Sequence, residues 1–132
     1  MKKRLKKILV VEDSKQFREN LVSLLEINNY STVEAVDGYV GYSKAVDELP
    51  DLIIADIMMP VMDGYELLKK IRSFDLTSTT PFVFLTAKTS PTEIKRGIDL
   101  GADAYITKPY NSGRLIKTIT SVFEKSKRVS VS

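Results

Sequence analysis

The chain has 132 residues, enough for one domain that buries about two-thirds of the surface of its unfolded chain. It contains no cysteine and no histidine, which excludes a disulfide framework and any metal site built from thiolates or imidazoles. No apolar run approaches the length of a membrane span, and the basic residues 1–7 lack the apolar segment of a secretion signal. We therefore expect a cytoplasmic protein that does not contact a membrane.

The formal net charge of +3 hides an uneven distribution. Residues 1–7 carry five basic side chains and residues 125–132 carry three, with no acid in either segment. Without these eight charges, residues 8–124 have a net charge of −5. The body of the chain is therefore a poor surface for nucleic acid. We expect a solvated basic arm over residues 1–6 and a basic tail, or the remnant of a linker, over residues 125–132.

Apolar runs typical of buried strands alternate with helical patterns along the chain. Strands are predicted over residues 7–11, 31–36, 51–55, 82–85 and 103–107. Helices are predicted from the N-cap Ser14 to about Asn28, and over residues 39–49, 65–74, 91–100 and 112–124. Gly41 weakens the prediction of the second helix, because glycine disfavours helix interiors.

The helical spacing also predicts which side chains face the core. These are Phe17, Leu21, Leu24, Leu25 and Asn28 in the first helix, Tyr42, Ala45, Val46 and Leu49 in the second, Leu67, Leu68 and Ile71 in the third, Ile94, Ile98 and Leu100 in the fourth, and Leu115, Ile116, Ile119, Val122 and Phe123 in the fifth. Five β/α units in succession predict a single α/β domain, residues 7–124, with a parallel sheet covered by helices on both faces.

Acidic side chains follow two of the predicted strands. Asp56 comes directly after the apolar run 51–55, and Glu12 and Asp13 follow the run 8–11. Open α/β sheets bind ligands beyond the carboxyl ends of their strands, where these carboxylates would meet. Crowded carboxylates repel unless a cation or a shared proton intervenes. Because every candidate ligand is an oxygen, Mg²⁺, or Mn²⁺ in its place, is the expected ion.

Two more strand ends add a hydroxyl and a cation. Thr86 follows the fourth predicted strand, and Lys108 follows the fifth. Together with the three carboxylates, these groups could hold a carboxylate nucleophile, a divalent metal and a phosphoryl group whose charge is neutralised.

At this point the sequence resembles the receiver domains of two-component response regulators, over about residues 7–124. The resemblance rests on Val-Val-Glu-Asp at 10–13, Asp-Ile-Met-Met-Pro-Val-Met-Asp-Gly at 56–64, Leu-Thr-Ala at 85–87 and Gly-Ala-Asp-Ala-Tyr-Ile-Thr-Lys-Pro-Tyr at 101–110. It implies a doubly wound, flavodoxin-like (βα)5 fold with strand order 2-1-3-4-5. It also implies a signalling domain that is not a turnover enzyme, although it catalyses its own phosphorylation on aspartate and a slow autodephosphorylation.

The resemblance assigns roles to individual residues. Asp56 would accept a phosphoryl group from a phosphohistidine on a histidine kinase or histidine phosphotransfer protein. Asp13, Asp56 and the main-chain carbonyl of Met58 would ligate Mg²⁺, and Glu12 would help through water. Lys108 and Thr86 would each contact a phosphoryl oxygen, and a cis peptide would precede Pro109. The absence of histidine means that this chain cannot carry its own phosphohistidine donor.

The same resemblance implies a conformational switch and a rate at which the phosphoryl group is hydrolysed. Recruitment of the Thr86 hydroxyl to the phosphoryl group would make space for the ring of Tyr105. The fourth helix, fifth strand and fifth helix, with Arg96, Tyr105 and Lys117, would then bind a downstream protein, an output domain of the same protein or a second copy of this chain. Met58 and Lys88 would flank the water that hydrolyses the phosphoryl group. Neither orients water as an amide or a carboxylate would, so we expect slow hydrolysis.

Three other functions each require a feature that this sequence does not have. A phosphatase of the haloacid dehalogenase type would need a second aspartate at position 58, and a flavodoxin-like cofactor binder would need a phosphate loop where Glu12 and Asp13 stand. A degenerate receiver would lack some of the five reactive side chains. Because the sequence ends soon after the last predicted helix, we expect no DNA-binding output module in it. Either a stand-alone regulator or a receiver from a longer protein fits this length.

Overall fold

The computed structural model describes residues 4–131 of the chain, with side chains to residue 126. Within this part, strands and helices alternate without exception. The elements are β1 (Lys7–Val11), α1 (Lys15–Ile27), β2 (Ser31–Ala35), α2 (Gly38–Glu48), β3 (Leu52–Ala55), α3 (Gly64–Ser73), β4 (Phe82–Thr86), α4 (Pro91–Asp99), β5 (Ala104–Thr107) and α5 (Ser112–Val131).

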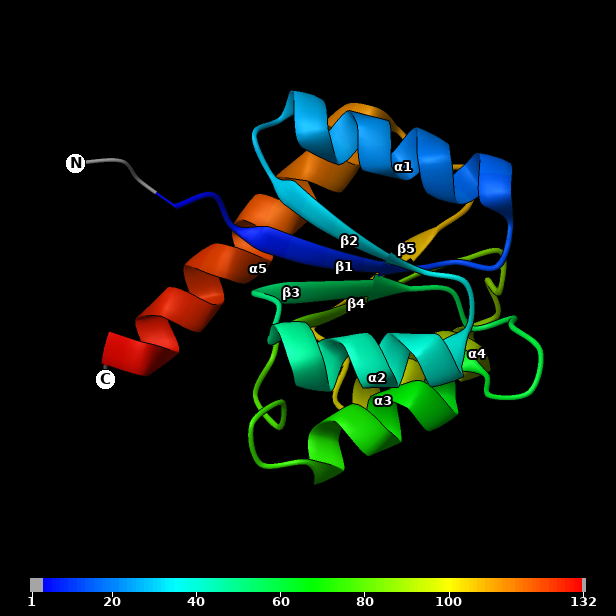
Figure 1. Cartoon of the computed structure of the whole chain (residues 1–132). Helices are drawn as coiled ribbons and strands as arrows, with labels where there is room; N and C mark the ends of the chain where they lie inside the picture. Colours follow the sequence, from blue (N-terminus) through cyan, green and yellow to red (C-terminus); the bar gives the residue numbers. More distant parts are fainter. Residues whose placement is uncertain (1–3, 132) are drawn as a thin grey trace.

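The five strands form one parallel sheet in the order β2-β1-β3-β4-β5, which confirms the predicted fold. Helices α1 and α5 cover one face, and α2, α3 and α4 cover the other (Figure 1). The central strands β1, β3 and β4 are buried on both sides, which explains why their sequences are continuous apolar runs.

The core has two layers, one on each face of the sheet. Between the sheet and α1 and α5 lie Ile8, Val10, Leu21, Leu25, Ile54, Leu85, Leu115 and Ile119, among others. Between the sheet and α2, α3 and α4 lie Leu9, Val11, Ala45, Ile53, Leu67, Leu68, Phe82 and Phe84, among others. The predicted inner faces of the first, third and fifth helices are confirmed, since their apolar side chains are all buried or partly buried in these layers. Asn28 is the exception, because it is the exposed C-cap of α1.

Gly41 brings α2 close to the sheet. A Cβ atom at this position would lie 3.0 Å from both Cγ atoms of Val11. The residue that weakened the prediction of this helix therefore has a packing role, because it lets the helix backbone approach β1.

Two predicted core side chains are instead exposed. Ile98 is 45% exposed, because α4 approaches the sheet through Gly97, whose nearest neighbours are Phe84 and Tyr105. Leu49 is 46% exposed because it is the C-cap of α2. With φ at 46° its backbone is left-handed, and its side chain leaves the helical periodicity.

The last helix is longer than the sequence pattern predicts. It continues to Val131, beyond the predicted end at residue 124, into the expected basic tail. Its inner apolar face ends near Phe123, but no glycine or proline follows, and lysine and arginine favour helices. Residues 1–3 of the expected arm and Ser132 lie outside the described residues. Within residues 4–131, no helix is long and apolar enough to cross a membrane.

Candidate functional site

Four neighbouring strands end at one edge of the sheet, where they bring together the predicted polar side chains. Glu12 and Asp13 follow β1, Asp56 follows β3, and Lys108 follows β5. Thr86 is the last residue of β4. Glu12, Asp56 and Thr86 are the buried polar side chains at this edge, whereas Asp13 is exposed.

Lys108 joins two of the carboxylates. Its Nζ donates to Oε1 of Glu12 at 2.7 Å and to Oδ2 of Asp56 at 2.9 Å. The same ammonium group lies 3.9 Å from the centre of the Phe17 ring, which supplies a cation–π contact from α1. The Lys108–Pro109 peptide bond is cis, as the resemblance implies.

The electrostatics reflect this burial and pairing. Burial raises the pKa of Glu12, although hydrogen bonds from Lys108 and from the main chain of Ser14 act in the opposite direction. Burial alone would lower the pKa of Lys108, but the hydrogen bonds to Glu12 and Asp56 outweigh it and the pKa is raised. Lys108 therefore remains an ammonium throughout the physiological range.

The three carboxylates have the arrangement that a hard cation needs. One oxygen from each of Glu12, Asp13 and Asp56 lies within 4.8 Å of the others. Among the described residues, Lys108 is the one cationic side chain that pairs with these carboxylates, so three carboxylates face one ammonium, and further positive charge would be stabilised there. The oxygen-only donor set fits Mg²⁺ or Mn²⁺.

The loop after β3 shapes the surroundings of Asp56. The main-chain N–H of Met58 donates to Oδ1 of Asp56 at 3.2 Å, and the main-chain N–H of Gly64 donates to the carbonyl of Ile57 at 2.9 Å. A Cβ atom on Gly64 would overlap the carbonyl oxygen of Asp56, so only glycine allows α3 to begin this close to the site. The Met58 carbonyl as a metal ligand stays a prediction.

The expected switch residues meet at Lys88. The main-chain N–H of Lys88 donates to Oγ1 of the fully buried Thr86 at 3.3 Å, and the Tyr105 hydroxyl donates to the carbonyl of Lys88 at 2.7 Å. The Tyr105 ring is partly buried against the core, with its centre 5.9 Å from that of the Phe84 ring. Burial raises the pKa of Tyr105 to about 12, so its hydroxyl stays protonated and able to donate.

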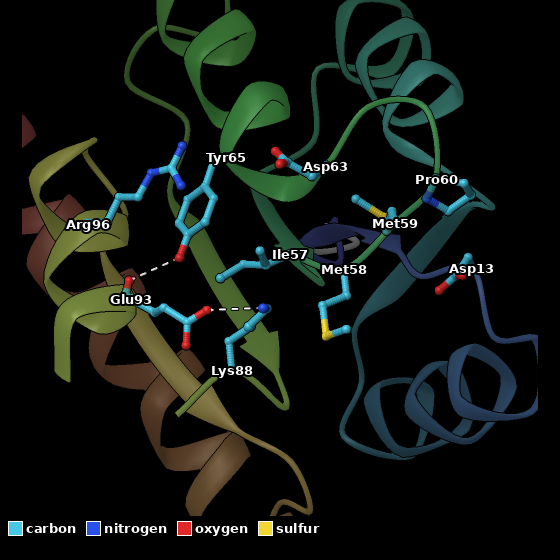
Figure 2. Close-up of a pocket in the computed structure, with 10 residues that line it drawn as sticks. All are labelled: Asp13, Ile57, Met58, Met59, Pro60, Asp63, Tyr65, Lys88, Glu93 and Arg96. Atoms are coloured by element: carbon cyan, nitrogen blue, oxygen red, sulfur yellow. Dashed lines mark hydrogen bonds and ion pairs between the residues drawn. The ribbon is translucent and has the colours of Figure 1, made fainter. Parts of the chain in front are cut away.

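A cavity of about 570 Å³ opens beside these groups (Figure 2). Met58 and Lys88 both line it, and the Nζ of Lys88 pairs with Oε2 of Glu93 at 3.2 Å. The sequence did not indicate that Tyr65 and Glu93 line this cavity, or that Phe17 contacts Lys108. It indicated only, through the helical pattern, that Phe17 faces the core and that a helix begins at Tyr65.

An acidic, metal-compatible site at the carboxyl edge of a 2-1-3-4-5 sheet defines a flavodoxin-like domain of the kind used in two-component signalling. Residues 8–120 match the family described as response regulator receiver domain, and the chain belongs to this family.

Proteins related to the chain include transcription regulators and a chemotaxis protein. The chain is 42% identical over 113 residues to the transcriptional regulatory protein DltR of Streptococcus agalactiae, across 86% of this chain and 50% of that protein. It is 37% identical over 130 residues to the phosphate regulon transcriptional regulatory protein PhoB of Escherichia coli, across 96% of this chain and 55% of that protein. The chain thus spans about half the length of these relatives.

Solved structures agree with this assignment. The chain superposes on chemotaxis protein CheY4 of Vibrio cholerae with a TM-score of 0.86 and 35% identity, covering 90% of this chain and 99% of that one. A CheY-like receiver domain protein from Methanospirillum hungatei gives a TM-score of 0.88 with 30% identity, covering 95% of this chain and 98% of that one.

Proposed function

We propose that the chain accepts a phosphoryl group on Asp56 from a phosphohistidine of a partner protein, in a Mg²⁺-dependent reaction, and thereby switches a protein-binding face. The observation that carries this proposal is the position of Asp56. One carboxylate oxygen bonds Lys108 Nζ at 2.9 Å, and one lies within 4.8 Å of the carboxylates of Glu12 and Asp13.

Asp56, Lys108 and Thr86 have separate roles in the phosphoryl transfer. An oxygen of Asp56 attacks phosphorus, the N–P bond of the phosphohistidine breaks, and its electron pair returns to the imidazole ring of the donor. Lys108 pairs with an oxygen of the transferring group and so stabilises charge that develops in the loose transition state. The Thr86 hydroxyl donates to another phosphoryl oxygen.

Asp13, Asp56 and the carbonyl of Met58 would hold the metal ion, with Glu12 acting through water. The bound ion supplies positive charge that offsets the phosphoryl oxygens. The same site hydrolyses its own phosphoaspartate slowly, so the domain works as a timed signal and not as a turnover enzyme.

The partners follow from this chemistry. The donor is a histidine kinase or a histidine phosphotransfer protein, because the chain has no histidine of its own. The receiver of the signal is a downstream protein, an output domain of the same protein or a second copy of this chain, bound through α4, β5 and α5. We assign no DNA or membrane contact to residues 8–124, whose net charge is −5, and we propose a cytoplasmic location.

Incubation with acetyl phosphate and Mg²⁺, followed by intact-mass measurement, tests the proposal. We expect a mass increase of one phosphoryl group that disappears in EDTA and in Asp56→Asn, which keeps the side-chain volume but removes the nucleophile. Asp63→Asn is the matched control, because Asp63 lines the same cavity and asparagine preserves its role as N-cap of α3. Equal phosphorylation of Asp56→Asn and the unchanged chain would overturn the assignment.

A further inference from the structure

Two tyrosine hydroxyls hold the connection between β4 and α4 from opposite sides. Tyr105 on β5 donates to the carbonyl of Lys88 at 2.7 Å, and Tyr65 at the start of α3 donates to the carbonyl of Glu93 at 3.1 Å. Lys88 lies in the loop and Glu93 in the first turn of α4. The switch that the resemblance implies accounts for only the first of these contacts.

Tyr65 is held by three contacts. It is only 4% exposed, its ring meets the edge of Phe84 at 5.7 Å, and the guanidinium of Arg96 lies 4.0 Å from its centre. Figure 2 shows the ring between Arg96 and Ile57, with the hydroxyl directed at the Glu93 main chain. A ring held by a cation–π contact and an aromatic edge loses little further entropy when its hydroxyl forms a hydrogen bond.

Lys88 and Glu93 connect the two tyrosines to the candidate site. Lys88 bonds Thr86 through its N–H, Tyr105 through its carbonyl and Glu93 through its ammonium group. The Glu93 carboxylate also accepts from the hydroxyl of Ser90, the N-cap of α4, at 2.8 Å. Thr86 at the site, the loop at Lys88 and the first turn of α4 at Glu93 are therefore joined by direct contacts to both tyrosines.

We propose that Tyr65 is a positioning residue of the phosphorylation switch. Its hydroxyl holds the first turn of α4 in the arrangement in which the Tyr105 ring packs against Phe84. This inference rests on the proposed function, in which movement of Thr86 to the phosphoryl group makes space for that ring. The arrangement with the Tyr105 ring against Phe84 is then the one that a phosphoryl group favours, and the Tyr65 bond stabilises it.

Beryllium fluoride, a tetrahedral mimic of the phosphoryl group, tests this with the full chain. Tyr65→Phe removes one hydroxyl and keeps the ring contacts with Arg96 and Phe84. We expect the Mg²⁺-dependent affinity for beryllium fluoride to fall about fivefold, the effect of losing one typical hydrogen bond from the favoured state. The affinity for Mg²⁺ alone should stay unchanged, because Tyr65 does not contact the three carboxylates. A fall in this affinity would reveal a damaged metal site.

Tyr42→Phe is the matched control. Tyr42 packs on the same face of the sheet, and among the described residues its hydroxyl has no hydrogen-bond partner. An affinity of Tyr65→Phe for beryllium fluoride that equals or exceeds that of the unchanged chain would overturn the role of Tyr65 alone. Failure of the unchanged chain to bind beryllium fluoride in Mg²⁺ would overturn the proposed function and this inference together.

Discussion

At the scale of single residues, the candidate site depends on a buried ammonium group. Lys108 is bonded to Glu12 and Asp56 and lies over the ring of Phe17. Removing one member of such a group leaves an uncompensated buried charge, which is costly. Glu12 thus has a contact that the sequence did not indicate, since it holds Lys108 directly. Asp13 is the exposed carboxylate of the three, so its replacement does not leave a buried charge uncompensated.

Asp13→Asn should weaken Mg²⁺ binding about tenfold, which corresponds to about 1.4 kcal/mol. A neutral amide removes one of the negative charges that offset the loss of water from the ion. Titration with Mg²⁺ followed by amide chemical shifts measures the affinity, with Asp63→Asn as the control, since Asp63 lines the same cavity. An unchanged affinity would contradict the assignment of Asp13 as a ligand.

The double variant Met58→Asn with Lys88→Glu should lose its phosphoryl group about tenfold faster, or about 1.4 kcal/mol of barrier. The two side chains line the cavity beside Asp56, and the substitutions supply an amide and a carboxylate that can orient water. Decay of the phosphorylated mass after removal of acetyl phosphate measures the rate. A double variant as slow as the unchanged chain would show that another feature controls the access of water.

At the scale of elements, short side chains and caps decide how closely the helices approach the site. Gly41 brings α2 against β1, Gly97 brings α4 against Phe84, and Gly64 begins α3 beside Asp56. The caps Ser14, Asp63 and Ser90 begin the helices that follow three of the four strands carrying site residues. Three residues join β1 to α1 and four join β4 to α4, which restricts the positions of the groups there, whereas eight residues join β3 to α3.

Gly41→Ala tests one of these approaches, because two effects of known size oppose each other. Alanine favours a helix interior by about 1 kcal/mol over glycine, whereas overpacking a rigid core costs about 1–3 kcal/mol. The added Cβ would lie 3.0 Å from both methyl groups of Val11, a stiff side chain that is only 1% exposed.

We therefore expect Gly41→Ala to lower the free energy of unfolding by about 1 kcal/mol in urea titrations. The exposed Ser43→Ala on the same helix is the control, and it should raise this free energy by a few tenths of a kcal/mol. A stabilised Gly41→Ala variant would show that α2 can move away from the sheet at little cost.

At the scale of the whole molecule, the site and the proposed binding face are linked through one loop. Thr86 ends a strand at the site, and Tyr105 lies on β5 between α4 and α5. A packed core transmits such a change as a shift between two discrete arrangements, because it is not continuously deformable.

Phosphorylation should therefore shift the amide resonances of Arg96, Tyr105 and Lys117 as well as those next to Asp56. Spectra of the chain with and without acetyl phosphate and Mg²⁺ measure this, and Asp56→Asn under the same conditions corrects for Mg²⁺ binding. Shifts confined to the residues around the three carboxylates would mean that the site and the face are not coupled.

The sequence alone determined the order and type of all ten elements, because apolar runs, helical spacing and caps are local signals. It also determined which residues stand at the strand ends, since parallel strands must bring their carboxyl ends to one edge. The strand order and the roles of Asp56, Lys108 and Thr86 came from the resemblance to a family, and the sheet confirms the order.

Only the tertiary structure decided the contacts between groups far apart in the chain. Lys108 and Glu12 are separated by 96 positions, and Tyr65 and Glu93 by 28, so no local pattern pairs them. The tertiary structure also decided that Ile98 is exposed, because Gly97, and not Ile98, is the residue of α4 that lies against the sheet. A helical pattern reports which side of a helix is apolar, whereas the depth to which that side is buried depends on neighbours that the pattern does not contain.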